Sequence, residues 1–100
     1  MFIGEGGKIV NQELLTEVIE NLNKVTDYLY QENIPVANQT LFIVLPKLDR
    51  CISEIADEEV QEILKEKLTA SLSAMEEEDY ILLADLIQYE VIDILKNIKD

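Results

Sequence analysis

Apolar residues recur every three or four positions along most of the chain, and this spacing limits the possible folds more than any other feature. In the first such run, Leu15, Val18, Leu22, Val25 and Leu29 follow one another at steps of three, four, three and four. Steps of this kind place side chains on one face of a helix, as in the seam of a left-handed bundle. The run therefore predicts an amphipathic helix.

Capping and turn signals divide the periodic residues into four helices. Asn11, Asp57 and Asp79 are suited to cap helix N-termini, and Pro35 fits the first turn of a new helix. The apolar face also changes direction by nearly half a turn near Ala56 and again across residues 76–79, so the chain must turn at both places. The expected helices are about 12–31, 36–56, 58–75 and 80–98.

The second helix contains Pro46 in its middle. Because the apolar phase continues unchanged after Pro46, we expect one helix that is kinked there. A break into two helices is the alternative, since TLFIV at 40–44 contains β-branched and aromatic residues that weaken helix preference.

Matched helix lengths and short connections predict an all-α fold, an antiparallel up-and-down four-helix bundle. Residues 10–100 are expected to form this single domain. Residues 1–9, which contain all three glycines, are expected to be a flexible N-terminal arm.

The charge of the chain restricts its partners. The formal net charge is −13, from 21 acidic and 8 basic residues. A surface of this sign repels nucleic-acid phosphates and anionic lipids, so we expect neither nucleic-acid nor membrane binding. No apolar run approaches the roughly 20 residues needed to cross a bilayer. A single cysteine and an N-terminus without a leader pattern favour a cytoplasmic location.

The sequence offers little for catalysis. Histidine is absent, which removes the commonest general base and a common metal ligand. Cys51 is expected to be a small buried hydrophobe. Asp85, Glu90 and Asp93 fit the solvated side of the last helix better than an acid and base pair. We therefore predict no enzymatic activity, no metal site and no cofactor.

The last helix has more apolar residues than a single buried face requires. It reads DYILLADLIQYEVIDIL over residues 79–95. Its core face is assigned to Tyr80, Leu83, Ala84, Ile87, Val91, Ile94, Leu95 and Ile98. Leu82, Leu86 and Tyr89 then form a second stripe, which Ile81 and Ile92 extend along one margin. On the second helix, Phe42 and Ile43 are likewise apolar residues that lie outside the expected core face.

Three occupants could cover this stripe: a second copy of the chain, a different protein, or the apolar residues of the N-terminal arm. The leading hypothesis is a non-catalytic protein interaction module that self-associates into a homo-oligomer, in which case Leu86→Lys should give a folded monomer. The alternative is a cytoplasmic escort or secretion-type chaperone that binds an amphipathic helix of a partner protein. Small, acidic, all-helical secretion and flagellar export chaperones provide an architectural analogy for it.

Overall fold

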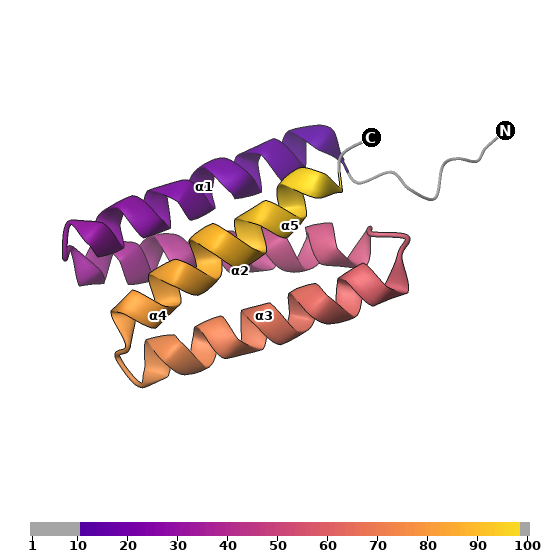
Figure 1. Ribbon diagram of the computed structural model, residues 1–100. Helices are drawn as coiled ribbons and strands as arrows, with labels where there is room; N and C mark the ends of the chain where they lie inside the picture. Colours follow the sequence, from indigo (N-terminus) through magenta and orange to yellow (C-terminus); the bar gives the residue numbers. More distant parts are fainter. Residues whose placement is uncertain (1–10, 99–100) are drawn as a thin grey trace, which may run out of the picture.

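Four helical rods lie side by side in the computed structural model, which describes residues 11–98 (Figure 1). The first three are α1 (Gln12–Tyr30), α2 (Ile34–Ser53) and α3 (Glu58–Glu76). The fourth is a continuous rod made of α4 (Tyr80–Asp85), η1 (Leu86–Val91) and α5 (Ile92–Asn97). Each rod runs antiparallel to the one before it, so the predicted all-α four-helix bundle is confirmed. The predicted arm, residues 1–9, lies outside the described residues.

The second rod is a single helix, as expected, although its bounds differ from the prediction. It begins at Ile34 rather than at 36, with Pro35 in its first turn, and ends at Ser53 rather than at 56. It continues through Pro46, whose nitrogen has no hydrogen to donate to the carbonyl of Phe42. Because Phe42 is exposed, water can satisfy that carbonyl.

The three predicted N-caps are all observed. The Asn11 side chain accepts a hydrogen bond from the Leu14 amide, and Asp57 accepts from the amides of Glu59 and Val60. Asp79 accepts from the amide of Leu82. Each cap satisfies amides that the first turn of a helix leaves unpaired, and it fixes the point where that helix starts.

The α1–α2 and α3–α4 connections have the same geometry. Glu32 and Glu78 both have a φ of 60°, in the left-handed region that usually belongs to glycine. The amide of Glu32 donates to the carbonyl of Leu29 (3.0 Å), and that of Asn33 donates to the carbonyl of Tyr28 (2.8 Å). Glu78 and the residue after it repeat this pattern with Met75 and Ala74. Two Schellman turns thus lie at one end of the bundle (Figure 1).

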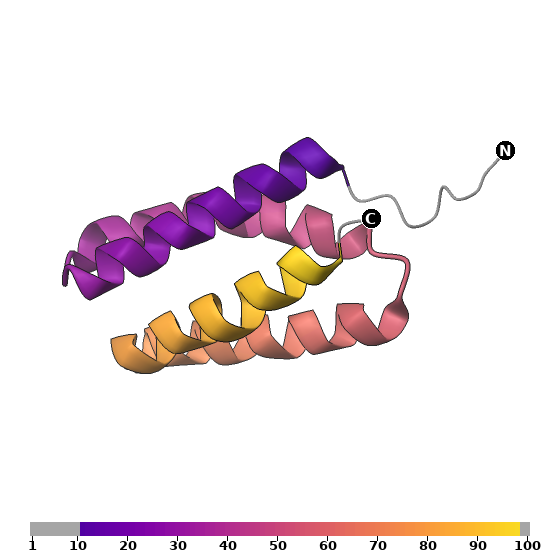
Figure 2. The ribbon, with the colours of Figure 1, turned by 45° about the horizontal axis from the view of Figure 1, so that its top comes forward.

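The core lies between two helix pairs, α1 with α2 and α3 with the last rod (Figure 2). Contact is most extensive between α1 and α2, whereas α2 and α3 touch much less. The largest fully buried side chains are Leu22, Leu41, Leu48, Ile52, Leu64, Leu83, Ile87 and Leu95. None of the helices within residues 11–98 is both long and apolar enough to span a membrane.

The last rod departs from regular α-helix in its middle, over η1. The Ile92 amide there donates to the carbonyl of Ile87, five residues earlier, instead of four. A π turn of this kind takes in one more residue than an α turn, which changes the direction of every side chain that follows it. This wide turn changes the side of the rod on which Ile92, the last residue of the predicted second stripe, lies.

Candidate interaction surface

The sequence pattern places five apolar residues of the last helix in a second stripe and along its margin, and three of them lie on the surface. Ile81 is 80% exposed, Tyr89 is 65% exposed and Leu82 is 44% exposed. They project from two turns of helix whose opposite side, including Leu83 and Ile87, is buried. We call Ile81, Leu82 and Tyr89 the α4 face.

The other two predicted stripe residues, Leu86 and Ile92, are buried, so their assignment to an exposed stripe is wrong. Leu86 is 9% exposed and Ile92 is 3% exposed, and both belong to the core cluster. The prediction assumed regular α-helical rotation throughout, whereas the π turn brings Ile92 round to the core. Leu86 belongs to η1, which packs against α3 and α1.

Phe42 and Ile43 are exposed as expected, but they form a separate surface on α2. They are 58% and 63% exposed. The α2 helix packs mainly on α1, whereas α4 packs on α1 and α3. The fold therefore does not join the α2 pair to the α4 face.

Tyr30, at the end of α1, adds an aromatic side chain beside the α4 face that the sequence reasoning missed. It is exposed, and its hydroxyl donates a 2.6 Å hydrogen bond to Oε1 of Gln88. Partial loss of hydration raises the pKa of the Tyr30 hydroxyl, and nearby Tyr89 and Asp85 act in the same direction. The sequence did show a tyrosine in the last turn of α1, outside the run of buried apolar residues. It did not show that α1 and α4 are neighbours.

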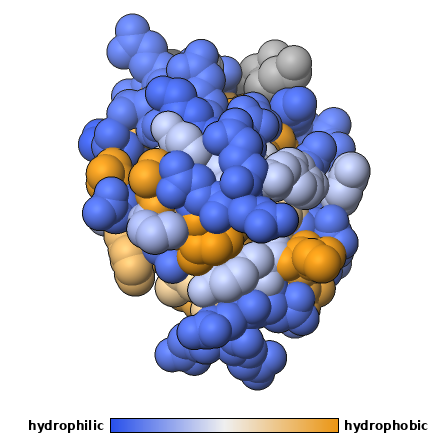
Figure 3. Space-filling view, turned by 90° about the vertical axis from the view of Figure 1, so that its left-hand side faces the viewer, coloured by the Kyte–Doolittle hydropathy of each residue, from blue (hydrophilic) through white to orange (hydrophobic). Residues whose placement is uncertain are grey.

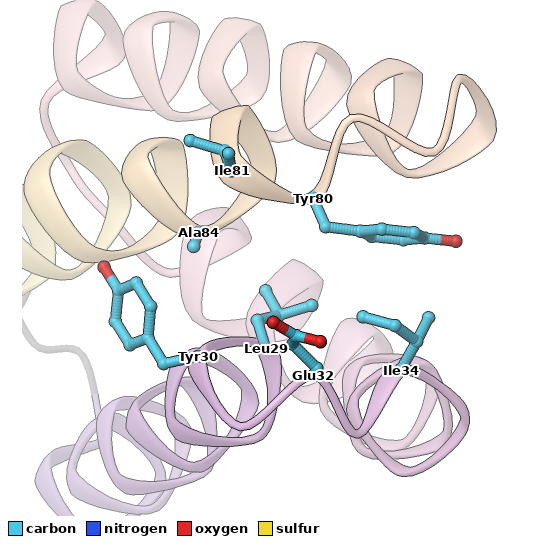
Figure 4. Close-up of a pocket in the computed structure, with 7 residues that line it drawn as sticks. All are labelled: Leu29, Tyr30, Glu32, Ile34, Tyr80, Ile81 and Ala84. Atoms are coloured by element: carbon cyan, nitrogen blue, oxygen red, sulfur yellow. The ribbon is translucent and has the colours of Figure 1, made fainter.

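A pocket of about 450 Å³ opens next to the α4 face, between the α1–α2 turn and the start of α4. Its walls are mostly apolar or aromatic: Leu29, Tyr30, Ile34, Tyr80, Ile81 and Ala84. The remaining lining residue, Glu32, lies between the two tyrosines with its carboxylate near Leu29 (Figure 4). Ile81 belongs to both the pocket and the α4 face, so the two are continuous.

Among the described residues, the helix ends and turns around this pocket carry no basic side chain. Residues 25–40 and 68–85, which build this end, contain no lysine or arginine. Their acidic residues are Asp27, Glu32, Glu76, Glu77, Glu78, Asp79 and Asp85. A view onto this end shows hydrophobic patches between hydrophilic residues (Figure 3). The pocket therefore opens in a strongly negative environment.

Ion pairs in the described part of the chain lie away from the pocket. Lys67 pairs with Glu90 at 2.6 Å, and this hydrogen bond raises the pKa of the Lys67 amine. Lys47 pairs with Glu17, and Arg50 lies near Glu54. Glu90 is thus part of a structural link between η1 and α3.

Cys51 has the properties expected of a core residue. It is fully buried, and burial, with a smaller effect of Glu54, raises the pKa of its thiol to about 11. A thiol of this kind is almost entirely protonated near neutral pH, so it is a poor nucleophile. Among residues 11–98, no group of three histidine, cysteine or acidic side chains is placed to hold a metal ion.

The fold and this surface define a class of protein: a small all-α four-helix bundle with an apolar face and pocket at its acidic end. The chain belongs to the family described as Domain of unknown function (DUF8042), whose model matches residues 11–100. Neither the curated proteins nor the solved structures contain a significant match.

Proposed function

We propose that the protein is a non-catalytic interaction module that binds an amphipathic helix of a partner protein through the α4 face. The observation that carries the proposal is the exposure of Ile81, Leu82 and Tyr89 along two turns of a rod that is buried on its opposite side. Full burial of a large apolar side chain contributes about 1.5 to 3 kcal/mol. A partner that covers all three therefore gains substantial binding energy.

The shape of the site supports a helix as the partner. Ile81 and Tyr89 are eight residues apart, which corresponds to about 12 Å along a helix. A partner helix of about three turns can cover that length and place one side chain over the adjoining pocket. This is the recognition mode of an escort protein. A cytoplasmic location is part of the proposal, and the free, buried state of the single cysteine is consistent with it.

Self-association is a second candidate function. The separate exposed pair, Phe42 and Ile43, favours it because a chain with two unlike apolar surfaces can contact two copies of itself. The negative charge around the α4 face opposes a dimer in which that face meets itself. Two Asp85 carboxylates would then approach each other without a lysine or arginine from residues 68–95 to offset them.

The first experiment combines light scattering with peptide titration on the full chain. We expect a monomer that binds a synthetic amphipathic helical peptide with micromolar affinity. Leu82→Lys and Tyr89→Lys should each weaken binding at least tenfold, because a lysine replaces a buried apolar contact. Ile63→Lys is the matched control, since Ile63 is 40% exposed on α3 and lies outside the α4 face.

The two candidates give different results. A stable dimer that Leu82→Lys converts to a monomer would favour self-association over partner binding. A monomer that binds no helical peptide would contradict both. Leu86→Lys is unsuitable for this purpose because Leu86 is buried and its substitution should unfold the protein.

A further inference from the structure

We infer that the partner helix is basic, and that one of its lysine or arginine side chains enters the pocket and pairs with Glu32. This inference rests on the proposed function and deepens it by naming the chemistry of the partner. Glu32 is the acidic residue of the pocket, and no ion pair or side-chain hydrogen bond within residues 11–98 involves it. Its charge is therefore available to a ligand.

The backbone at Glu32 supports a role for this side chain. A left-handed conformation costs a residue other than glycine roughly 1 to 2 kcal/mol. Glycine would suit this turn better, yet the chain has glutamate at the position that opens into the pocket. Glu78 occupies the equivalent position in the other turn, where it does not line this pocket, and so provides an internal comparison.

The pocket combines features that suit a long cationic side chain. Leu29, Ile34 and Ala84 provide apolar walls for its hydrocarbon stem. Tyr30 and Tyr80 add aromatic rings to the lining of the pocket (Figure 4), and aromatic faces attract cations. The volume of about 450 Å³ is large enough for one such side chain but too small for a whole helix.

Charge complementarity selects this occupant over a second copy of the chain. The segments that build this end, residues 25–40 and 68–85, supply no cation of their own. A second copy presenting the same end would add further carboxylates, whereas a basic helix would offset them. The apolar positions of that helix would cover Ile81 and Tyr89 while its cation reaches Glu32.

The test uses two synthetic peptides with the full chain. Both are 18-residue amphipathic helices with leucine on one face, and they carry either lysine or glutamate on the other. We expect the lysine peptide to bind at least tenfold more tightly at low salt. Glu32→Gln should weaken its binding five- to tenfold without weakening binding of the glutamate peptide, for which a repulsive charge is removed. Glu78→Gln, in the equivalent turn, and Glu13→Gln, at the opposite end of α1, should change the affinity less than twofold.

Other outcomes separate this inference from the proposed function. If both peptides bind equally and Leu82→Lys weakens both, the α4 face binds helices but the inference of a basic partner is wrong. If Glu32→Gln and Glu13→Gln have equal effects, the lysine peptide recognises only the overall charge. If Phe2→Ser in the full chain strengthens binding, the chain's own N-terminal segment competes for the face, which overturns the assignment to a separate partner.

Discussion

At the scale of single residues, the two glutamates with positive φ are the clearest sites of local strain. We predict that Glu78→Gly stabilises the fold by about 0.5 to 1 kcal/mol, because relief of the left-handed strain exceeds the entropy that glycine gains on unfolding. Urea unfolding followed by circular dichroism measures this difference. Gln31→Gly is the control, since Gln31 has a φ of −85° and should lose stability on the same substitution.

The same substitution at Glu32 separates folding from function. Glu32→Gly should also stabilise the fold, since its turn has the same hydrogen bonds, but it should lose affinity for a lysine-bearing helix because the carboxylate is gone. A variant that is more stable and binds more weakly would show that the strained glutamate serves binding. Equal affinity for Glu32→Gly and the wild type would contradict that role.

At the same scale, Cys51 makes a pH-dependent contribution to the free energy of unfolding. Burial raises the pKa of its thiol from 9.0 to about 11 in the folded state. Because the folded state holds the thiol proton more tightly, this contribution is fully present below pH 9. It is lost as the pH rises toward 11. We predict a loss on the order of 2 kcal/mol across this window.

Denaturant unfolding at pH 8, 9, 10 and 11 measures that loss. Cys51→Ala is the matched control, because it should be less stable at every pH while lacking the part of the decline that belongs to the thiol. Every other group is the same in the two proteins, so only the difference between the two curves counts. Parallel curves would contradict the prediction.

At the scale of helices, the π turn in the last rod decides which predicted residues are core. Leu83, Ile87, Val91 and Leu95 are all buried and follow one another at steps of four. In a regular α-helix, steps of four drift steadily around the axis, so only a wider turn can keep them on one face. Deleting Tyr89 turns the middle step into three, which restores the ordinary seam.

We therefore predict that deletion of Tyr89 gives a folded protein with a regular last helix and a stability close to that of the wild type. Deletion of Glu20, an exposed residue in the middle of α1, is the control. It rotates the second half of the α1 seam by about 100° and should abolish cooperative unfolding. Thermal unfolding of the two variants tests the comparison. Equal damage from both deletions would contradict the prediction.

The outcome for the helices shows what the sequence could reveal. Their ends were predictable because Asn11, Asp57 and Asp79 cap them through bonds within a few residues. A search for period 3.6 did not anticipate the π turn and so misplaced Ile92, which follows it. It also misplaced Leu86, which comes before the wide turn and lies in the segment that packs on α3 and α1. The steps of four from Leu83 to Leu95 were the signal that could have revealed the π turn.

The candidate site was less predictable than the fold. Ile81, Leu82 and Tyr89 could be assigned to the surface from the phase of one helix. The pocket could not, because it joins the α1–α2 turn to the start of α4. When each helix has a single buried apolar face, the sequence alone does not specify which helices pack side by side. Tyr30 and Glu32 therefore became candidates only once the fold was known.

At the scale of the whole molecule, charge is distributed unevenly between the two ends of the bundle. Residues 25–40 and 68–85 supply only acidic charges to the end with the Schellman turns, whereas the lysines and the arginine lie outside these segments. Repulsion within one end destabilises the compact state, and dissolved salt screens exposed charges over about 10 Å at 0.1 M. We predict that the melting temperature rises with sodium chloride.

Two single variants test whether the acidic end is the source of that effect. Glu77→Gln removes a charge from the acidic turn, next to the negative end of α3, and should raise the melting temperature at low salt by about 2 °C. Glu62→Gln, on the same helix but three residues before Lys65, should leave it nearly unchanged. Differential scanning calorimetry at 10 mM and 500 mM sodium chloride should show the gain from Glu77→Gln disappearing at high salt. A gain that persists at high salt would instead point to a local change at the end of α3, and the uneven charge would then matter for attracting a basic partner more than for stability.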